Sequence, residues 1–271
     1  MKTLTFLIAT VLLTSCMGSY SKIFNASGNA NFVKGSKNCV TKNIKVDNSF
    51  DQLKINANAN IYYIQQSGAP RVEVYTSDNI LPLLDIKVKD ETLCIGFKKE
   101  MQLIINKLDI RISSPNLKDI ILNGSGNVEW TKGIRTDDFR ITINGSGNVN
   151  GETLHCKHLE CCISGSGNIN VNSITSTSTK AAVSGSGTIT LSGKTETGAY
   201  SISGSGTIHT ASLQAWNASA SVNGSGYIEC HAHQTLKANV SGSGRIGYKG
   251  KPAIKLSLIH ISEPTRLLSI S

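Results

Sequence analysis

The residues best suited to chemistry lie in one short segment, His155 to Cys162, which holds two histidines, one glutamate and three cysteines. Imidazole nitrogens and thiolates at short spacing are the ligands that Zn²⁺ prefers. The spacing matches no zinc finger, however, and Cys161 occupies a position that is apolar in neighbouring segments. Cys230, His231 and His233 lie about four structural repeats away, too far to complete one site. We therefore expect buried cysteines and solvent-facing histidines, and no metal or other cofactor.

Paired carboxylates are the second chemistry to consider, because glycoside hydrolysis uses two of them about 5–9.5 Å apart. Glu129 and Glu229 share one position in the repeat described below, but they lie five repeats apart, about 24 Å at ~4.8 Å per repeat. Glu152, Glu160 and Glu196 fall at other positions. We therefore assign no catalytic residues and expect no enzyme.

A repeat organises the second half of the chain and must position all of these residues. The hexamer Asn/Ser-Gly-Ser-Gly-X-Val/Ile occurs seven times, at successive spacings of 21, 20, 20, 19, 20 and 18 residues. A fixed period near 20 indicates a solenoid, in which each unit buries its apolar face only by stacking on its neighbours. The structural glycines of the repeat are Gly124, Gly126, Gly145, Gly147, Gly165, Gly167, Gly185, Gly187, Gly204, Gly206, Gly224, Gly226, Gly242 and Gly244.

Aliphatic residues flank each hexamer at positions that share one face of a strand, because strand side chains alternate. They are Leu122, Ile143, Ile163, Val183, Ile202, Val222 and Val240 before it, and Val128, Val149, Ile169, Ile189, Ile208, Ile228 and Ile246 at its end. Two explanations of the glycines compete. Either another backbone approaches too closely for a Cβ, or the chain turns through positive φ. A phosphate-binding glycine loop is rejected because no helix follows it.

The fold class that this pattern predicts is an all-β, single-stranded β-helix over residues 121–250. Like residues recur at like offsets, and in a parallel coil such residues stack, so that asparagine side chains can hydrogen-bond to one another. The alternative is an antiparallel β-meander with Gly-Ser-Gly turns. Residues 39–120 also alternate at strand period and contain turn signals at Ser67–Pro70 and Lys89–Thr92, so we interpret them as irregular first coils.

The first residues read as an export signal. Lys2 precedes the apolar run Leu4 to Leu13, which is too short to span a bilayer, and Leu13-Thr14-Ser15-Cys16 resembles the lipobox of bacterial lipoproteins. We predict a lipoprotein signal peptide at 1–15, lipidation of Cys16 and a linker at 16–38. The alternative is an ordinary secretory signal with a chance cysteine. The six remaining cysteines permit disulfides in an exported protein but show no regular spacing.

The net charge of +9 is unevenly distributed. Six lysines lie between positions 22 and 54, whereas residues 121–248 carry eight basic and seven acidic side chains. A nucleic-acid-binding protein needs a basic stripe on its folded face, so nucleic acid is excluded as a partner. The lysines near the anchor are expected to meet anionic lipid or polysaccharide.

The C-terminal segment from Leu256 to Arg266 resembles one reading frame of a transposase adapter used to prepare sequencing libraries. We interpret residues 256–271 as an adapter-derived artefact and expect the native chain to carry at least one further repeat. The alternative is a genuine C-terminal tail.

Several segments in order resemble a known family: Ser49-Phe50-Asp51-X-Leu53-X-Ile55, Asn60-Ile61 with Gln65, Leu81-Pro82, Asp90-Glu91-Thr92-Leu93, Ile110-X-Ile112-X-X-Pro115-X-Leu117, and Gly-Ser-Gly-Asn-Val. They resemble the head GIN domain family, which carries an auto-transporter adhesin label and is common among lipoproteins of the Bacteroidota. The resemblance covers roughly residues 40–255 and implies a right-handed, single-stranded β-helix. Because no heptad stalk or membrane β-barrel is recognised in this sequence, we expect that it is not a complete auto-transporter.

The function expected from these patterns is a non-enzymatic lipoprotein of the cell envelope, in the outer membrane, facing the periplasm or the exterior. It would present a rigid β-helix as an adhesin-like or scaffold surface to a glycan or protein. An envelope lyase or hydrolase acting on polysaccharide is the alternative. Five aromatic residues are candidates for stacking on sugar rings: Trp130, Tyr200, Trp216, Tyr227 and Tyr248.

Overall fold

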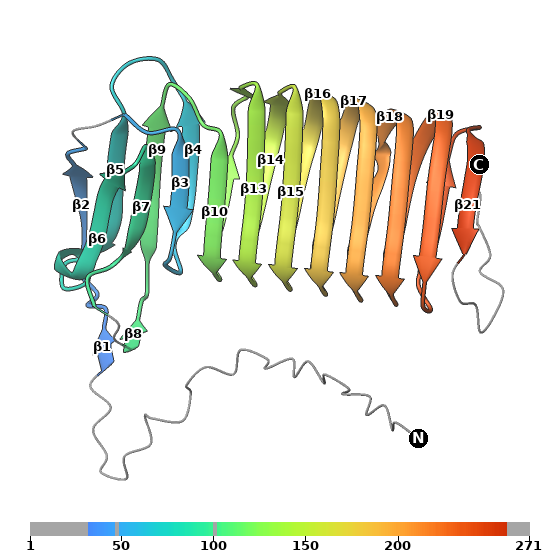
Figure 1. Cartoon of the computed structure of the whole chain (residues 1–271). Helices are drawn as coiled ribbons and strands as arrows, with labels where there is room; N and C mark the ends of the chain where they lie inside the picture. The colour runs from blue at the N-terminus through green and yellow to red at the C-terminus, as the bar shows by residue number, and fades with distance from the viewer. Residues whose placement is uncertain (1–31, 47–48, 100–101, 259–271) are drawn as a thin grey trace, which may run out of the picture.

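The protein is an elongated tube of stacked β-coils with a capped N-terminal end (Figure 1). The computed structural model describes residues 32–46, 49–99 and 102–258, so the predicted signal peptide, Cys16 and residues 259–271 lie outside the described part. The repeat strands are β10 Asp119–Gly124, β11 Asn127–Trp130, β12 Ile134–Arg135, β13 Asp138–Gly145, β14 Asn148–His155, β15 His158–Gly165, β16 Asn168–Gly185, β17 Thr188–Gly204, β18 Thr207–Gly224, β19 Tyr227–Ser241, β20 Arg245–Lys249 and β21 Ala253–Leu258.

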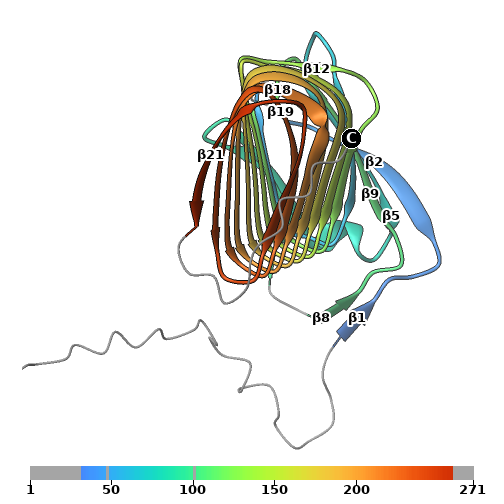
Figure 2. The same cartoon turned by 90° about the vertical axis from the view of Figure 1, so that its right-hand side faces the viewer.

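The coils are parallel, which confirms the β-solenoid and excludes the antiparallel meander for the repeats. Every pairing among β10 to β21 is parallel, and each hexamer pairs in register with the next. One wall contains β10, β13, β15 and the last halves of β16 to β19, and the facing wall contains β11, β14 and their first halves. Viewed along its axis, the tube is flattened, with the Gly-Ser-Gly turns at one end and a broader arc at the other (Figure 2).

The predicted aliphatic residues fill the thin interior between the two walls. Leu122, Ile143 and Ile163 stack in successive coils, and every member of both aliphatic sets is at most 4 % exposed. Burying one such side chain contributes about 1.5–3 kcal/mol relative to leaving it exposed. Repetition of the same inward positions therefore supplies the stabilisation of the tube.

The two explanations of the glycines are both correct: positive φ applies to the first glycine of each pair, and close approach of another backbone applies to every glycine of the pairs except Gly124. The first glycine of all seven hexamers has positive φ, between +110° and +138°, so it makes the turn. The second has no positive φ, but a Cβ there would lie within 2.8 Å of a carbonyl oxygen of the adjacent coil. At Gly187, for example, it would meet Gly167 O and Ile163 Cγ2, each at 2.7 Å. The first glycine therefore makes the sharp turn, and the absence of a Cβ at both positions lets the turns of successive coils stack closely.

The N-terminal region differs from the predicted run of first coils. Its elements are β1 Phe32–Lys34, β2 Cys39–Ile44, β3 Gln52–Ile55, β4 Asn60–Gln65, β5 Arg71–Ser77, η1 Leu81–Leu83, β6 Leu84–Lys89, β7 Thr92–Phe97, β8 Gln102–Ile104 and β9 Leu108–Ser114. β3 and β4 stack in parallel under β10 and β11, and β7 and β9 stack in parallel under β3 and β4. The coil made by β7 and β9 is thus outermost, although it comes later in the sequence.

Antiparallel strands close this end of the tube. β6 pairs with β7, and β5 pairs with both β9 and β2. The turn between β6 and β7 is made by Asp90 and Glu91, both with positive φ, as a two-residue type I′ hairpin turn requires. β3, β4, β7 and β9 therefore stack as coils, whereas β2, β5 and β6 pair in antiparallel fashion at the edge, which the expectation of irregular first coils did not include. Such strands act as a cap for the stacked coils.

The last part of the predicted linker is attached to this cap. β1 pairs in parallel with β8, and the Ser36 hydroxyl donates to Asp78 Oδ1 at 2.5 Å. No helix among the described residues is long and apolar enough to cross a membrane.

Candidate ligand-binding surfaces

The histidine–cysteine segment, His155 to Cys162, connects β14 on one wall to β15 on the other, and some of its side chains belong to the core. Cys161 is fully buried as predicted, and burial raises the pKa of the Cys156 thiol to about 12. His158 Nδ1 is 2.8 Å from the Ser178 hydroxyl of the next coil. Across residues 32–46, 49–99 and 102–258, no group of three or more His, Cys, Asp or Glu is placed to hold a metal ion.

A row of alternating charges crosses the wall that contains β15 at one position per coil: Asp119, Arg140, Glu160 and Lys180. Arg140 lies 3.9 Å from Asp119 and 3.1 Å from Glu160, and Lys180 Nζ lies 2.7 Å from Glu160. Burial raises the pKa of Asp119, whereas the hydrogen bond from Lys180 lowers the pKa of Glu160.

The two carboxylates of this charged row have pKa values shifted in opposite directions, and such a difference can mark an acid and base pair. Between them, however, the guanidinium of Arg140 occupies the space that a scissile bond would need. The row therefore acts as an ion-pair ladder across successive coils. Glu129 and Glu229 are linked in register through Asn150, Asn170, Thr190 and His209, so they lie five coils apart, as the repeat predicts.

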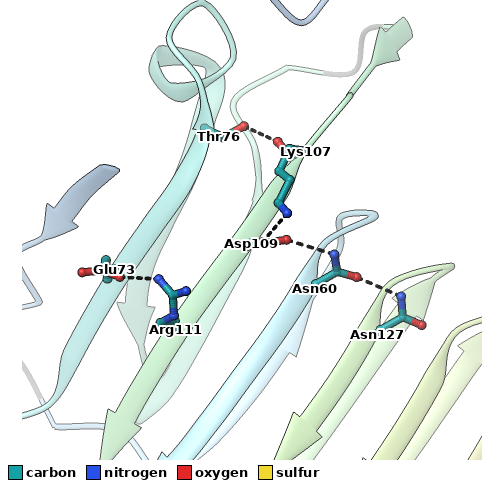
Figure 3. Close-up of polar contacts among 7 residues, drawn as sticks. All are labelled: Asn60, Glu73, Thr76, Lys107, Asp109, Arg111 and Asn127. Atoms are coloured by element: carbon teal, nitrogen blue, oxygen red, sulfur yellow. Dashed lines mark hydrogen bonds and ion pairs between the residues drawn. The ribbon is translucent and has the colours of Figure 1, made fainter. Parts of the chain in front are cut away.

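An asparagine ladder runs along the opposite wall, as predicted for a parallel coil. The Nδ2 atoms of Asn127, Asn148 and Asn168 each donate to the Oδ1 atom of the asparagine before them, at 2.8–2.9 Å. Asn60 in turn donates to Asp109 Oδ1 at 3.0 Å, and Lys107 forms an ion pair with Asp109 at 3.3 Å (Figure 3). The ladder thus extends from the third repeat coil into the N-terminal cap and ends on an ion pair.

The N-terminal groove is the outer surface of β2, β5, β9 and β4. It encloses about 870 Å³, and Tyr62, Ile64, Arg71, Glu73 and Arg111 are among the residues that line it. Arg111 donates to Glu73 Oε1 at 2.8 Å across the antiparallel pair β5–β9 (Figure 3). This groove presents both signs of charge beside apolar side chains.

The residues of the N-terminal groove were not predicted from the sequence. Asn60 and Asn127 occupy equivalent positions in successive coils. Glu73 and Arg111, by contrast, meet through the antiparallel pairing of β5 and β9, which no sequence repeat indicates. The turn signals at Ser67–Pro70 were the available clue to it, because they indicate that β5 reverses direction after β4.

The Trp216 pocket lies at the arc between the two walls. It encloses about 670 Å³ and is lined by Lys194, Glu196, Gln214, Trp216 and His233, among others. Trp216 is 57 % exposed, and its ring centroid lies 6.1 Å from that of His233 in the next coil.

The other predicted aromatic candidates are less available. Trp130 and Tyr200 are core residues at 1 % and 2 % exposure, so the prediction that they could stack on sugar rings is wrong. Trp130 packs edge-on against Phe139 at 5.7 Å. Tyr227 and Tyr248 are half-buried. Only Trp216 of the five presents most of its side chain to solvent.

These features define the class: a β-solenoid whose walls carry ordered rows of polar side chains. Residues 49–176 and 152–252 match the family described as "Putative auto-transporter adhesin, head GIN domain". These ranges span most of the chain, so it belongs to the head GIN domain family, as its sequence motifs implied.

Solved structures of similar proteins come from the Bacteroidales. A "putative adhesin" from Parabacteroides distasonis ATCC 8503 is 31 % identical with a TM-score of 0.80, over 84 % of this chain and 97 % of that one. A "putative adhesin" from Parabacteroides merdae ATCC 43184 is 28 % identical with a TM-score of 0.80, over 84 % and 95 %. A "putative lipid binding protein" from P. distasonis is 30 % identical with a TM-score of 0.79, over 84 % and 96 %. A search of curated proteins found no match.

Proposed function

We propose that this protein is a non-enzymatic lipoprotein of the cell envelope that presents its β-solenoid as an adhesin-like binding surface. The observation that carries the proposal is the asparagine ladder, in which each side chain is held by the next at 2.8–2.9 Å. A surface whose side chains are already ordered loses little conformational entropy when a ligand binds. Membership of a family with an adhesin label supports a role at the cell surface or envelope.

The ligand in this proposal is a glycan or a protein, met by the mature chain on the outside of a membrane to which Cys16 holds it. Two acyl chains on one cysteine bind a membrane far more firmly than one, at about 0.8 kcal/mol per buried methylene. The lysines that follow the anchor would lie close to anionic lipid. No nucleic acid is among the proposed partners.

The test of binding uses the purified mature chain immobilised on beads. The beads are offered a panel of purified glycans and extracellular matrix proteins, with release of reducing sugar measured in parallel. Saturable capture without sugar release is the expected result. Turnover of a polysaccharide without saturable binding would refute the proposal.

The same assay addresses the enzymatic alternative, an envelope lyase or hydrolase. The observation in its favour is the divergent environment of Asp119 and Glu160. If they were an acid and base pair, Glu160→Gln would abolish sugar release. A binding protein would show no release before or after this substitution.

Anchoring is tested separately in cells. Metabolic labelling with a palmitate analogue should mark the wild-type protein, and Cys16→Ser should remove both the label and partition into the membrane fraction. Retention of the label in Cys16→Ser would rule out Cys16 as the lipid attachment point.

A further inference from the structure

Trp216 differs from every other large apolar side chain of the repeat coils. Among the described residues, the exposed large hydrophobic side chains are Phe32, Tyr62, Ile104 and Trp216. The first three belong to the N-terminal cap, so Trp216 at 57 % exposure is the one that lies on a repeat coil. Tryptophan is usually highly buried, and an exposed indole is therefore informative.

The groups around the indole come from three successive coils. In β17, Glu196 lies between Thr195 and Thr197, which pair with Ala215 and Asn217 on either side of Trp216. On the β19 side, His233 packs against the ring, and His233 lies 4.7 Å from His231, centroid to centroid. Lys194 and Gln214 are paired neighbours in the next outward row. Trp216 is thus bordered by a carboxylate, an ammonium group and an amide.

The floor of the Trp216 pocket is held by buried hydroxyl groups. Ser176 Oγ lies 2.8 Å from Thr179 Oγ1 and 3.0 Å from Thr195 Oγ1, and all three residues are buried. Asn217 Oδ1 accepts a hydrogen bond from Thr235 Oγ1 at 2.6 Å. The first two bonds connect positions on β16 and β17, and the third links β18, which carries Trp216, to β19. Because β18 is paired in register with β17 and bonded to β19 beside Trp216, the strands that line the pocket are ordered before any ligand arrives.

This chemistry matches a carbohydrate ring. A pyranose has an apolar face of C–H groups and a rim of hydroxyls, and an indole offers a flat apolar body with a polar edge. A carboxylate accepts hydrogen bonds from hydroxyls, an ammonium group donates to them, and an amide does both. Because neighbouring coils are about 4.8 Å apart, hydroxyls on opposite sides of one ring can reach different coils.

A protein partner fits the site less well. Protein interfaces concentrate their binding energy in clustered apolar and aromatic anchors, and their cores are depleted of charged side chains. Here a single indole stands among Lys194, Glu196 and His233, and no second exposed large hydrophobic side chain adjoins it in the described coils.

We propose that the Trp216 pocket is a carbohydrate-binding site, in which a pyranose ring stacks on Trp216 and its hydroxyls bond to Glu196, Lys194 and Gln214. The inference rests on the proposed adhesin-like function and names the ligand class for one of its surfaces.

The experiment uses intrinsic fluorescence, because the chain has two tryptophans and only Trp216 is exposed. The mature protein is titrated with methyl glycosides of glucose, galactose, mannose and N-acetylglucosamine and with their short oligomers. Saturation-transfer NMR on the same samples identifies which sugar protons touch the protein. At least one sugar should change the exposed tryptophan emission saturably and protect it from iodide quenching.

Three variants decide the outcome. Trp216→Ala should weaken binding at least ~10-fold, as expected for loss of an aromatic contact together with its buried area. Glu196→Gln keeps the shape and removes the charge, and should weaken binding less. Phe32→Ala removes an aromatic side chain that is 55 % exposed on β1, away from both candidate surfaces, and should leave binding unchanged. Circular dichroism confirms that each variant is folded.

The proposal is overturned if no sugar of the panel perturbs Trp216, or if Trp216→Ala binds the sugar as tightly as the wild type does. Bead capture that survives in Trp216→Ala would leave the adhesin-like function standing while refuting this site. Capture of a purified protein that is lost in Trp216→Ala would also refute it, in favour of a protein ligand. Absence of any saturable ligand on the beads would instead refute the broader function.

Discussion

Single glycine-to-alanine substitutions would separate the two physical reasons for glycine in the repeat. Gly124 has a φ of +111°, and a Cβ there would meet nothing within 4 Å. Gly187 has no positive φ, but its Cβ would lie 2.7 Å from a backbone oxygen. Gly185 combines both restrictions, with a φ of +125° and a Cβ 2.5 Å from Gly165 O. The three positions therefore form a natural series: conformation alone, contact alone, and both.

The expected costs follow from these geometries. A non-glycine residue held in such a conformation costs about 1–3 kcal/mol. Forcing a methyl group into a well-packed space also costs about 1–3 kcal/mol. Alanine also lowers the conformational entropy of the unfolded chain, which offsets about 0.4–1 kcal/mol of the lost unfolding free energy in each case. Gly124→Ala and Gly187→Ala should each lose roughly 1–2 kcal/mol of unfolding free energy, and Gly185→Ala about 2–5 kcal/mol.

Urea unfolding followed by circular dichroism measures these differences, with all variants at one protein concentration. Gly68→Ala is a matched control, because Gly68 has a φ of +107° in an open turn between β4 and β5. It should resemble Gly124→Ala. Unchanged stability of Gly187→Ala would contradict the close approach of successive coils. Equal losses for Gly124→Ala and Gly185→Ala would show that the carbonyl oxygen of the adjacent coil imposes no cost.

Three further outcomes are expected. Cys161 should resist alkylation in the folded protein, because burial raises its thiol pKa, while half-buried Cys39 and Cys94 react faster than Cys161, as mass spectrometry of labelled peptides would show. Trp130→Ala should cost about 3–5 kcal/mol in urea unfolding, since its ring is 1 % exposed; a loss below ~1 kcal/mol would contradict its place in the core. The hydrogen bond from Lys180 lowers the pKa of Glu160 in the folded state. The ionised Glu160 therefore stabilises the folded protein fully above the pKa that it has in the unfolded chain, and this stabilisation is lost as the pH falls through the lower pKa of the folded state. Glu160→Gln should reduce stability at pH 7 by less than ~1 kcal/mol and flatten its decline at acidic pH; an unchanged acid profile would refute this assignment.

Much of the tube could be predicted from residue types and spacing. The period of about 20 residues, the inward position of Cys161 and the hydrogen-bonded row of Asn127, Asn148 and Asn168 all follow from repetition at fixed offsets. Repetition is informative because, in a parallel coil, identical side chains become neighbours. Solvent-facing and core positions alternate by strand geometry alone.

The N-terminal cap could not be predicted in the same way. Its strands do not repeat, and parallel pairing places β7 and β9 outside β3 and β4, in an order opposite to that of the sequence. Pairs such as Glu73 with Arg111 depend on that register. Local alternation identifies strands, but the choice of partner strand is made by packing over long sequence separations.

The sequence by itself determined the stacked coils and their inner and outer positions through its period, and the membership of the family through its ordered motifs. Only the tertiary structure decided which glycine bends the chain, which aromatic side chains are buried, and that Trp216 lies among Glu196, Gln214 and His233. Those features depend on how closely adjacent coils approach and on where register shifts fall between β17, β18 and β19. A shift of one residue in strand pairing changes which face a side chain occupies, and the sequence period near 20 is too irregular to specify it.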